Sequence, residues 1–481
     1  MDKKKVVVLG AGISGLTFSI ELLLKGYQVT LIEKNNEIGG LCSGYFVNGH
    51  YIDGCLHWLM GTKKDSKLYK IWQTNGGFAP DQEFISLPTL GSFEYQGTTV
   101  TFYRDLEKTR VELTKLSPED KKNIDLFINS SKEMTYLMSR VQGYRQMLGN
   151  EYRRYVRNYS HIIKCMKLSR EDYAKRFKHP AIQFAIKNCQ TGYSNMFFYL
   201  DLYGIFSSGN ADIPVGGALY LVERIKNKFL SLGGELLVNT EAKEVVVNNN
   251  KADSVITNKG EIKGDYIVSC LDAKYTLEKL LDNKYQVKQL TKVDKNIDKQ
   301  PISSCYNVYI AVNGDTSNID VPTGLNISSI KVGKSETDFL LVRPYHFDKC
   351  FIKDGKTVVS LFVDQNQDDY QYFASLSKEE YKKEVKRINN ALIDAFKKRY
   401  PEFKDKVELL SYFSPIELKN RTNSSYGAIQ AYSFTDKGPF YIYNGKIKSL
   451  DNFYLCSQWN RAIGGTPTAI LSATSIAKKF K

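Results

Sequence analysis

The sequence lacks several features that define whole classes of protein. In its 481 residues, no uninterrupted apolar run approaches the ~18 residues that a membrane-spanning helix needs. The eight cysteines are scattered without C-x-x-C pairs, so we expect reduced thiols, with neither a disulfide framework nor a metal site. No internal repeat or low-complexity tract is present either. These absences leave a globular protein as the class to be explained.

The charge balance is basic, with 67 Lys and Arg residues against 52 Asp and Glu residues. Such an excess suits an anionic membrane surface or a nucleic acid. The basic residues are spread thinly along the chain and form no RNA-binding or helix-turn-helix signature, so we expect no nucleic-acid partner. The length exceeds that of one ordinary hydrophobic core, which predicts two or more domains.

The N-terminal residues carry the most specific motif of the chain. The apolar run Val6–Leu9 predicts a strand, and it leads into a G-x-G-x-x-G turn formed by Gly10, Gly12 and Gly15. Gly10 permits a tight turn, Gly12 leaves room for a phosphate, and Gly15 allows the next helix to pack on the strand. The N-terminus of that helix favours negative charge. The motif predicts a dinucleotide site.

A second strand, Gln28–Ile32, follows the helix and ends in Glu33. A carboxylate at this position accepts hydrogen bonds from a ribose and repels a 2′-phosphate. Strand, helix, second strand and terminal acid are therefore all in register with a nucleotide-binding unit.

The segment after Glu33 contains the glycine pair Gly39-Gly40, followed by Leu41 and Cys42. Together with the N-terminal motif, it resembles flavoproteins of the amine oxidase superfamily, and the phytoene desaturase and carotenoid isomerase branch in particular. In that family the glycine pair begins a loop around the FAD pyrophosphate. Many members have an arginine where this chain has Leu41. Without that arginine, backbone amides and a helix dipole are expected to hold the phosphates.

Further segments extend the resemblance. Pro214–Gly217 is similar to the start of a helix in the family, and Ala242 matches a position whose backbone contacts adenine. Near the C-terminus, Gln458 matches a position beside the ribityl chain, and Gly464-Gly465 matches the turn before a helix that faces the flavin ring. The resemblance implies FAD as the cofactor. It implies cofactor contacts from Gly10, Gly12, Ile13, Ser14, Gly15, Glu33, Lys34, Gly39, Gly40, Leu41, Cys42, His57, Trp58, Ala242, Gln458, Gly464, Gly465 and Thr466.

The resemblance also implies the fold class and its domains. It is an α/β fold in which a Rossmann-like FAD-binding domain, of the GR2 type of flavoprotein, is joined by an α+β substrate domain and a helical lid insert. The FAD-binding domain is expected to be discontinuous, because its motifs lie in three separated stretches. The expected boundaries are 1–75, 206–285 and 425–481 for the FAD-binding domain, 76–130 and 286–424 for the substrate domain, and 131–205 for the insert.

Local patterns predict the elements of the substrate domain. Gln96-Gly97 predicts a hairpin turn, and Ser117-Pro118 predicts the cap and first position of a helix. The apolar runs Cys305–Val312 and Thr357–Val363 predict strands. The spacing of apolar residues over Lys378–Arg399 predicts an amphipathic helix. The strands would form a sheet over a substrate cavity.

Basic and aromatic residues interleave over Arg140–Arg157. In the carotenoid enzymes of the family, a helical lid near this point approaches the bilayer. A surface helix rich in Arg and Tyr suits contact with anionic lipid, and a solvated helix face is the alternative. The lysines before the first strand do not begin a secretory signal, because no small-residue cleavage site follows the apolar stretch. We expect a cytoplasmic protein that binds peripherally to the inner face of the membrane.

Asp53 and His57 are the candidate catalytic residues. The segment Tyr51–Gly54 resembles the element that leads the chain toward the flavin ring. His57, which stands beside Trp58, could act as an acid or a base in an apolar pocket. The alternative is a buried histidine with a structural role.

The leading functional hypothesis is an FAD-dependent oxidoreductase that desaturates, saturates or isomerises C=C bonds of a lipophilic substrate. The first alternative is a flavin amine oxidase. The second is a non-redox FAD enzyme, such as a double-bond isomerase, a hydratase or a sugar mutase. A membrane-recruited binding protein with a vestigial flavin site is a further alternative. The electron acceptor or donor stays open, because no second G-x-G-x-x-G predicts a nicotinamide site.

Overall fold

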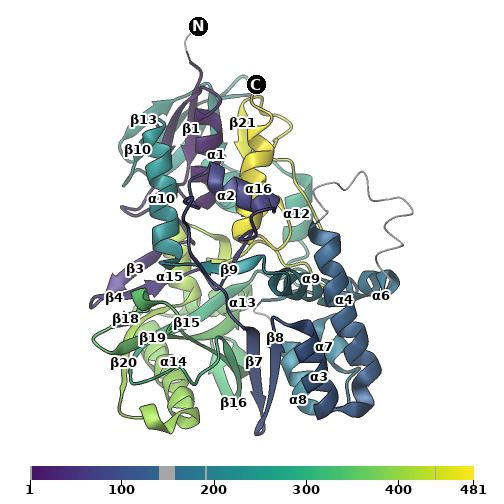
Figure 1. Ribbon diagram of the computed structural model, residues 1–481. Coiled ribbons are helices and arrows are strands. Elements are labelled where there is room, and N and C mark those ends of the chain that lie inside the picture. Colours follow the sequence, from purple (N-terminus) through teal and green to yellow (C-terminus); the bar gives the residue numbers. More distant parts are fainter. Residues whose placement is uncertain (1–2, 140–157, 190–191, 439) are drawn as a thin grey trace.

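The computed structural model describes the chain except residues 1–2, 140–157, 190–191 and 439 (Figure 1). The basic and aromatic segment Arg140–Arg157 therefore lies outside the described residues, and its expected membrane role stays a prediction.

The first sheet has five parallel strands from distant parts of the chain, in the order β10-β2-β1-β14-β21. These strands are β1 (Lys5–Leu9), β2 (Gln28–Ile32), β10 (Glu235–Leu237), β14 (Tyr266–Ser269) and β21 (Phe453–Leu455). Val6, Val7 and Val8 of β1 are fully buried. Such apolar strands are expected where both faces of a parallel sheet are covered.

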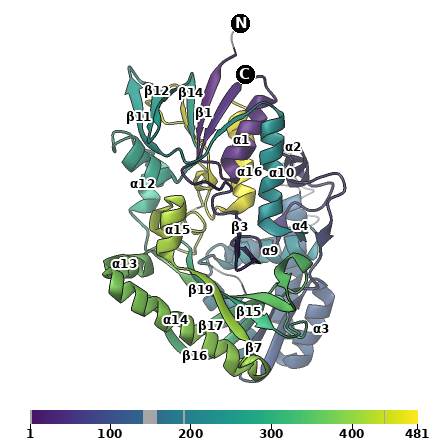
Figure 2. The ribbon, with the colours of Figure 1, turned by 90° about the vertical axis from the view of Figure 1, so that its left-hand side faces the viewer.

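Helices cover one face of this sheet, and a small antiparallel sheet covers the other (Figures 1 and 2). The helices are α1 (Ile13–Leu23), α2 (Lys67–Thr74), α10 (Gly217–Ser231) and α16 (Gly465–Ala477). The small sheet consists of β11 (Ala242–Asn248), β12 (Lys251–Thr257) and β13 (Gly260–Lys263). Val6 and Val8 pack toward the helices, whereas Val7 and Leu9 pack toward the small sheet. This alternation is the two-residue period of a strand.

The second sheet is mostly antiparallel and has the order β20-β15-β19-β17-β16-β7-β8, with β18 paired to β19. Its strands are β7 (Thr89–Tyr95), β8 (Thr98–Tyr103), β15 (Ser304–Asn313), β16 (Thr323–Val332), β17 (Ser335–Pro344), β18 (Ile352–Lys353), β19 (Lys356–Gln365) and β20 (Val407–Phe413). α14 (Lys378–Arg399) packs on one face of this sheet through Ile388, Leu392 and Phe396. The opposite face is turned toward the first sheet (Figure 2).

A group of helices packs beside the hairpin β7-β8 (Figure 1). These helices are α3 (Leu106–Leu116), α4 (Lys121–Ser139), α6 (Tyr159–Cys165), α7 (Arg170–Ala174), α8 (Pro180–Asn188) and α9 (Met196–Ser207). Their shared core includes Ile124, Phe127, Ile128 and Met134, which are fully buried as their spacing predicts. None of the helices in the described part of the chain combines the length and hydropathy that a membrane span requires.

The remaining elements connect these layers. They are β3 (Gly44–Val47), β4 (His50–Asp53), β5 (Leu59–Met60), β6 (Phe84–Ile85), β9 (Ala211–Pro214), α11 (Ala273–Tyr275), α12 (Lys288–Asp294), α13 (Gln367–Ser375) and α15 (Pro415–Thr422). α15 lies between the two large sheets in Figure 2. Its position matters for the site described below.

Several local predictions can be compared directly with these elements. Gln96-Gly97 forms the turn of the β7-β8 hairpin, with both residues at positive φ as a tight hairpin turn requires. The helix α14 has the predicted bounds. Ser117 and Pro118 occupy the predicted cap and first positions, but of a 3-10 turn, Pro118–Asp120, that precedes α4. The Ser117 hydroxyl donates to Asp120 Oδ2 at 2.7 Å and makes no hydrogen bond to a backbone amide of the turn. The expected domain boundaries stay a prediction.

Candidate functional site

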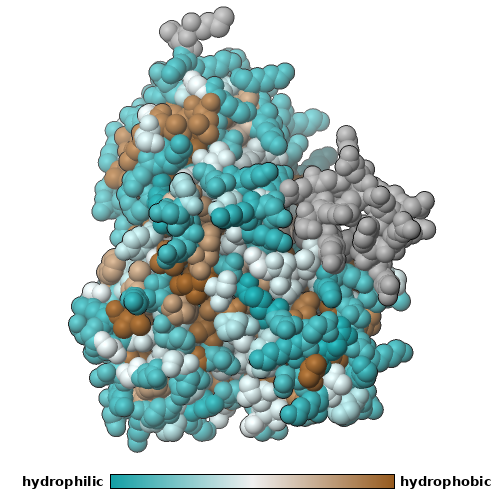
Figure 3. All heavy atoms as spheres, viewed as in Figure 1, coloured by the Kyte–Doolittle hydropathy of each residue, from teal (hydrophilic) through white to brown (hydrophobic). Residues whose placement is uncertain are grey.

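A cavity of about 1550 Å³ runs between the two large sheets and reaches α9. Ligand pockets for a single small molecule measure roughly 300–1000 Å³. The cavity is therefore large enough for a dinucleotide together with a second molecule. Apolar side chains gather at the waist of the molecule, between the sheets, in Figure 3.

The glycine turn after β1 forms one end of this cavity. Gly10 has φ +94°, and its amide donates to Ile32 O at 2.8 Å. A Cβ at Gly15 would lie 2.0 Å from Gly10 O, so Gly15 permits the close packing of α1 on β1. A Cβ at Gly12 would meet no protein atom closer than 3.8 Å, and Gly12 faces the cavity. Protein packing does not explain the glycine at position 12, whereas the close approach of a phosphate would.

Two helix N-termini open into the cavity, those of α1 and α16. Neither helix has a capping side chain at its N-cap residue, Gly12 or Gly464, and neither has an acidic residue in its first turn. Free amides and the helix dipole make such ends favourable for anions and for electron-rich groups. Ser14 joins the two helices, because its hydroxyl donates to Ala469 O at 3.2 Å.

Glu33 is buried beside the glycine turn and lines the same end of the cavity. Its Oε2 accepts from the Ala11 amide at 3.0 Å, and its Oε1 accepts from the amide and side chain of Asn35 at 3.0 and 2.9 Å. These contacts hold the carboxylate beside the glycine turn, with further lone pairs for a ribose. Ala242 lines the same end.

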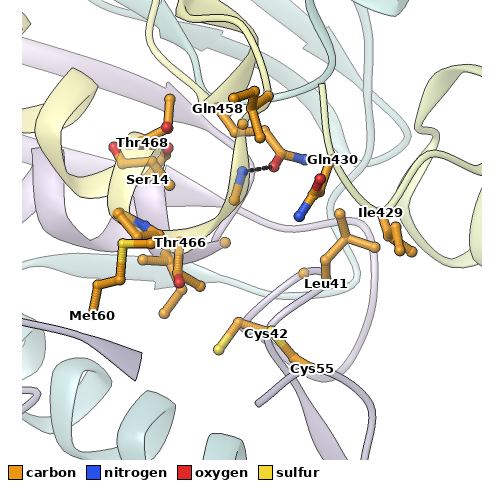
Figure 4. A pocket seen from close by; sticks show the side chains of 18 of the residues that line it. Ser14, Leu41, Cys42, Cys55, Met60, Ile429, Gln430, Gln458, Thr466 and Thr468 are labelled. Carbon is orange, nitrogen blue, oxygen red and sulfur yellow. Dashed lines mark hydrogen bonds between the residues drawn. The ribbon is translucent and has the colours of Figure 1, made fainter. Parts of the chain in front are cut away.

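Leu41 occupies the position where many members of the family have an arginine. It packs, with Ile429, against an apolar cluster that includes Leu341 and Phe362 of the second sheet (Figure 4). A cation comes instead from α15: Arg421 lines the cavity, and its Nε lies 3.5 Å from Gly40 O. The guanidinium also pairs with Glu37 at 3.2 Å.

Lys34 fixes the position of the segment after α15. Its Nζ donates to Asn420 O at 2.7 Å and to Asn423 Oδ1 at 2.8 Å. Burial lowers the pKa of Lys34. The residues around Arg421 are thereby joined to the loop that follows Glu33.

Gln458 caps the turn before α16. Its Oε1 accepts from the Gly465 amide at 2.7 Å, the contact drawn as a dashed line in Figure 4. The side-chain amide still faces the cavity as a donor. Thr466 and Thr468 lie beyond it in the first turn of α16.

Asp53, a candidate catalytic residue, is corrected by the structure. It is buried and does not line the cavity. Its Oδ1 accepts from the Cys55 and Leu56 amides, and its Oδ2 accepts from the Ala218 amide, each at 2.8 Å. Burial raises its pKa to about 6. Asp53 thus caps the start of α10 and orders the strand end before His57, which is a structural role.

His57 lines the cavity and is bound to Arg343 of β17. Its Nδ1 accepts a hydrogen bond from Arg343 Nη1, and its ring packs edge-on to Phe362 with a centroid distance of 6.4 Å. Burial and the guanidinium hold the pKa of His57 well below its usual range. The ring is therefore neutral, with its hydrogen on Nε2, and Nδ1 is not free to act as a base.

Arg343 is itself unusual. It is 5% exposed, lines the cavity and hydrogen-bonds the Tyr345 side chain. Burial lowers its pKa, but a guanidinium stays charged at any physiological pH. Within the described part of the chain, no carboxylate forms an ion pair with it.

Asp201 places an acid in the helical wall of the cavity. It is 5% exposed on α9, between apolar neighbours such as Leu202 and Ile205. Its Oδ1 has no hydrogen-bond partner among the described residues. Burial raises the pKa of Asp201 to about 7.

The structure brings most of the predicted cofactor residues to one cavity. Those that line it are Gly10, Gly12, Ile13, Ser14, Glu33, Lys34, Gly39, Gly40, Leu41, Cys42, His57, Trp58, Ala242, Gln458, Gly464, Gly465 and Thr466. Gly15 supports the turn from behind, as described above. Their contacts with a cofactor stay a prediction.

Arg343, Asp201 and Arg421 were not predicted from the sequence. Two of them do carry a local signal. Asp201 is a single acid within the apolar run Met196–Phe206, and Arg343 ends the apolar run Phe339–Val342. Charged residues are seldom buried among apolar neighbours, because burying a charge is costly unless another group compensates it. Arg421 has no comparable signal, because its surroundings are polar.

The fold and this cavity define a class of protein, a two-sheet flavoprotein whose glycine turn and paired helix ends fit the phosphates and ring of FAD. The family comparison agrees. The model of the flavin containing amine oxidoreductase family matches residues 13–479, and the chain belongs to this family. FAD is accordingly its cofactor.

Individual relatives are distant. The chain is 26% identical over 311 residues to a neurosporene-forming phytoene desaturase of Rhodobacter capsulatus, covering 62% of this chain and 57% of that one. It is 22% identical over 460 residues to a chloroplastic prolycopene isomerase of Daucus carota, covering 85% and 69%. The chain thus spans little more than half the length of the bacterial relative.

Solved structures share the fold. An oxidoreductase of Methanosarcina mazei superposes with a TM-score of 0.61 at 14% identity, covering 98% of this chain and all of that one. A putrescine oxidase bound to putrescine superposes with a TM-score of 0.58 at 12% identity, covering 99% of each chain. At these identities the comparison establishes the fold alone.

Proposed function

We propose that the protein is an FAD-dependent oxidoreductase that forms, removes or rearranges C=C bonds in a lipophilic substrate. The observation that carries this proposal is the continuous cavity, which joins a nucleotide cradle to an apolar compartment between the sheets. The similarity to a phytoene desaturase and a prolycopene isomerase supports the substrate class.

The proposed cofactor contacts divide along the cavity. Glu33 would hold the adenosine ribose, and the α1 N-terminus with Gly12 and Arg421 would hold the pyrophosphate. The α16 N-terminus would face the electron-rich edge of the ring. When bound there, FAD supplies the electron-transfer chemistry. The protein's own contribution is to hold the substrate against the ring and to exclude water.

Extraction of the purified holoprotein tests this proposal. Native mass spectrometry should show one FAD per chain, and solvent extraction followed by lipid mass spectrometry should recover an unsaturated apolar molecule. Photoreduced or dithionite-reduced protein should be reoxidised by an unsaturated acceptor, or oxidised protein bleached by its saturated counterpart. A flavin that stays unchanged, together with lipids that are all recovered without a new, lost or shifted C=C bond, would reject the proposal.

Amine oxidation is a second candidate, favoured by Asp201. An unpaired carboxylate near Phe197 and Phe198 could bind an ammonium group. Arg343 argues against it, because a buried cation in the same cavity repels a cationic substrate. Production of hydrogen peroxide with putrescine or an aromatic amine would favour this candidate over the first.

We also propose that the cavity opens toward an anionic membrane surface. Phe440 and Ile442 line the cavity yet are 48% and 54% exposed. Ile442 forms an antiparallel backbone bridge with Arg461. Arg461 lies near two further cations, Lys67 and Lys478, and the pKa of Lys67 is lowered by burial and by both of these neighbours. Apolar side chains next to a cluster of cations are typical of a bilayer-facing rim.

Liposome sedimentation tests this rim. The double variant Phe440→Ser and Ile442→Ser should bind vesicles of 30% phosphatidylserine at least tenfold more weakly than the original chain, since burying the exposed half of each apolar side chain contributes about 0.8–1.5 kcal/mol. Leu409→Ser, which removes an exposed apolar residue of β20 away from the cavity, serves as control and should bind normally. Equal binding by all three proteins would remove the rim from the proposal.

A further inference from the structure

The polar part of the substrate compartment contains hydrogen-bond donors and a guanidinium, that of Arg343, which forms no ion pair with the described residues. Arg343 projects from β17 into the cavity wall and holds His57 in the tautomer with its hydrogen on Nε2. Both side chains therefore present donors. Nearby acceptors have donors within the protein: Asn307 Oδ1 accepts from Ser360 at 2.7 Å, and the Asp53 carboxylate accepts from three backbone amides.

A buried guanidinium without a carboxylate is costly. Removing a charge from water carries a large penalty, which folded proteins offset by a paired opposite charge. Its hydrogen-bond partners among the described residues, His57 and Tyr345, are neutral, and the Asp53 carboxylate, which is bound to three backbone amides, acts on it only from beyond ion-pair distance. In the proposed function the phosphates of FAD lie elsewhere, at the glycine turn and Arg421 of α15. The counter-charge of Arg343 is therefore expected from the second molecule in the cavity.

The surroundings indicate what that molecule is. Leu341 and Phe362 flank Arg343 and His57 in the cavity wall, and Leu41, Leu418 and Ile429 continue the same apolar cluster. An apolar wall that contains one guanidinium, that of Arg343, fits a molecule that is apolar along its length and carries a negative charge at one end.

We propose that Arg343 and His57 form an oxyanion-binding subsite, and that the substrate is a lipophilic molecule with an acid group at one end. This inference rests on the proposed function and gives its substrate class a head group. A carboxylate matches the planar fork of Arg343, and a phosphate monoester offers the same oxygens. Neither a neutral polyene nor an amine would satisfy the guanidinium.

The subsite is tested with three ligands that have the same kind of hydrocarbon tail and differ in their head group: oleate, oleyl phosphate and oleyl alcohol. Each is titrated into the holoenzyme below its micelle concentration. Binding is read by calorimetry and by perturbation of the flavin absorption. We expect oleate to bind about 30-fold more tightly than oleyl alcohol, since hydrogen bonds to a charged group are the strong ones. If oleyl phosphate binds more tightly than oleate, the acid group of the substrate is a phosphate. If oleate binds more tightly than oleyl phosphate, it is a carboxylate.

Variants at position 343 separate a ligand site from a structural one. In Arg343→Gln the preference for the acids should disappear, and in Arg343→Lys about a fifth of it should remain, because charge stays but the fork is lost. Arg387→Gln, an exposed arginine of α14 paired with Glu384, serves as control and should keep the full preference. Without ligand, Arg343→Gln should melt at the same temperature as the original holoenzyme or higher, because an unpaired buried charge is removed.

Several results would overturn the proposal. They are equal binding of acid and alcohol, no binding of any of the three ligands, a preference that survives in Arg343→Gln, or a large fall in the melting temperature of that variant. A shifted flavin reduction potential with an unchanged acid preference would assign the guanidinium to the flavin instead. FAD content is measured in the same samples, so loss of the cofactor, which bears on the proposed function, is distinguished from loss of the subsite.

Discussion

The two ends of the cavity are built in different ways. The end proposed for the nucleotide consists of glycines, backbone amides and helix N-termini, and its central part, Gly10 to Glu33, is contiguous in the sequence. The substrate end consists of side chains from distant elements, such as His57 after β4, Asp201 on α9 and Arg343 on β17. A site made of backbone amides tolerates substitution at most of its positions, but not at the glycines that give the ligand room. A side-chain site can change its ligand through one substitution.

This contrast predicts the largest effect at Gly12. In Gly12→Val the side chain would enter the space proposed for the pyrophosphate, so FAD affinity should fall more than 100-fold, equivalent to about 3 kcal/mol. The measurement is the flavin-to-protein ratio after gel filtration, with circular dichroism to verify folding. In Gly233→Ala, where a Cβ meets no atom within 4 Å, FAD should be retained despite a positive φ. Normal FAD content in Gly12→Val would place the phosphates elsewhere.

At the substrate end, Asp201 should affect stability rather than FAD binding. The pKa of Asp201 rises from 3.8 to about 7 on burial, so the folded state holds a proton that the unfolded state releases above pH 3.8. Stability relative to Asp201→Asn is therefore unaffected below pH 3.8, falls as pH rises from 3.8 to 7, and is constant above 7. Between pH 5.5 and pH 8.5 the difference should grow by about 2 kcal/mol in favour of Asp201→Asn.

Urea unfolding of the two proteins at both pH values measures this difference. Groups that titrate alike in both proteins cancel. Asp451→Asn, the same change at an exposed position, is the matched control. A constant difference between Asp201→Asn and the original chain would show that Asp201 is already ionised in the folded state at pH 5.5, contrary to its buried setting on α9.

The same contrast explains how much could be predicted from the sequence. The strands of the first sheet, the hairpin at Gln96-Gly97 and the bounds of α14 follow from local periodicity and turn chemistry. The glycine turn and Glu33 follow from contiguous spacing. The class of site was therefore predictable wherever neighbours in sequence are also neighbours in space.

The substrate end could not be predicted in this way. His57 was identified, but its partner Arg343 lies 286 positions away and fixes its tautomer. Asp53 looked catalytic because it is an acid near the expected ring, whereas the start of α10, distant in the sequence, uses its carboxylate as a cap. Such roles depend on which elements pack together, and no local pattern contains that information.

The smallest expected effect on FAD affinity is at Arg421. This residue tests the comparison between the two ends directly, because it is a side chain at the end that otherwise consists of backbone groups. The missing arginine at Leu41 suggested that backbone amides alone hold the phosphates, yet Arg421 brings a cation to Gly40 from α15. Part of its charge is used by Glu37, and its side chain is 24% exposed, so the expected contribution is modest. In Arg421→Met the FAD dissociation constant should rise about tenfold, equivalent to about 1.4 kcal/mol, and this effect should shrink in high salt. Arg387→Met, on the opposite side of the second sheet, should bind FAD normally. If both variants bind FAD equally well, backbone amides and helix dipoles suffice, and α15 only covers the adenosine end.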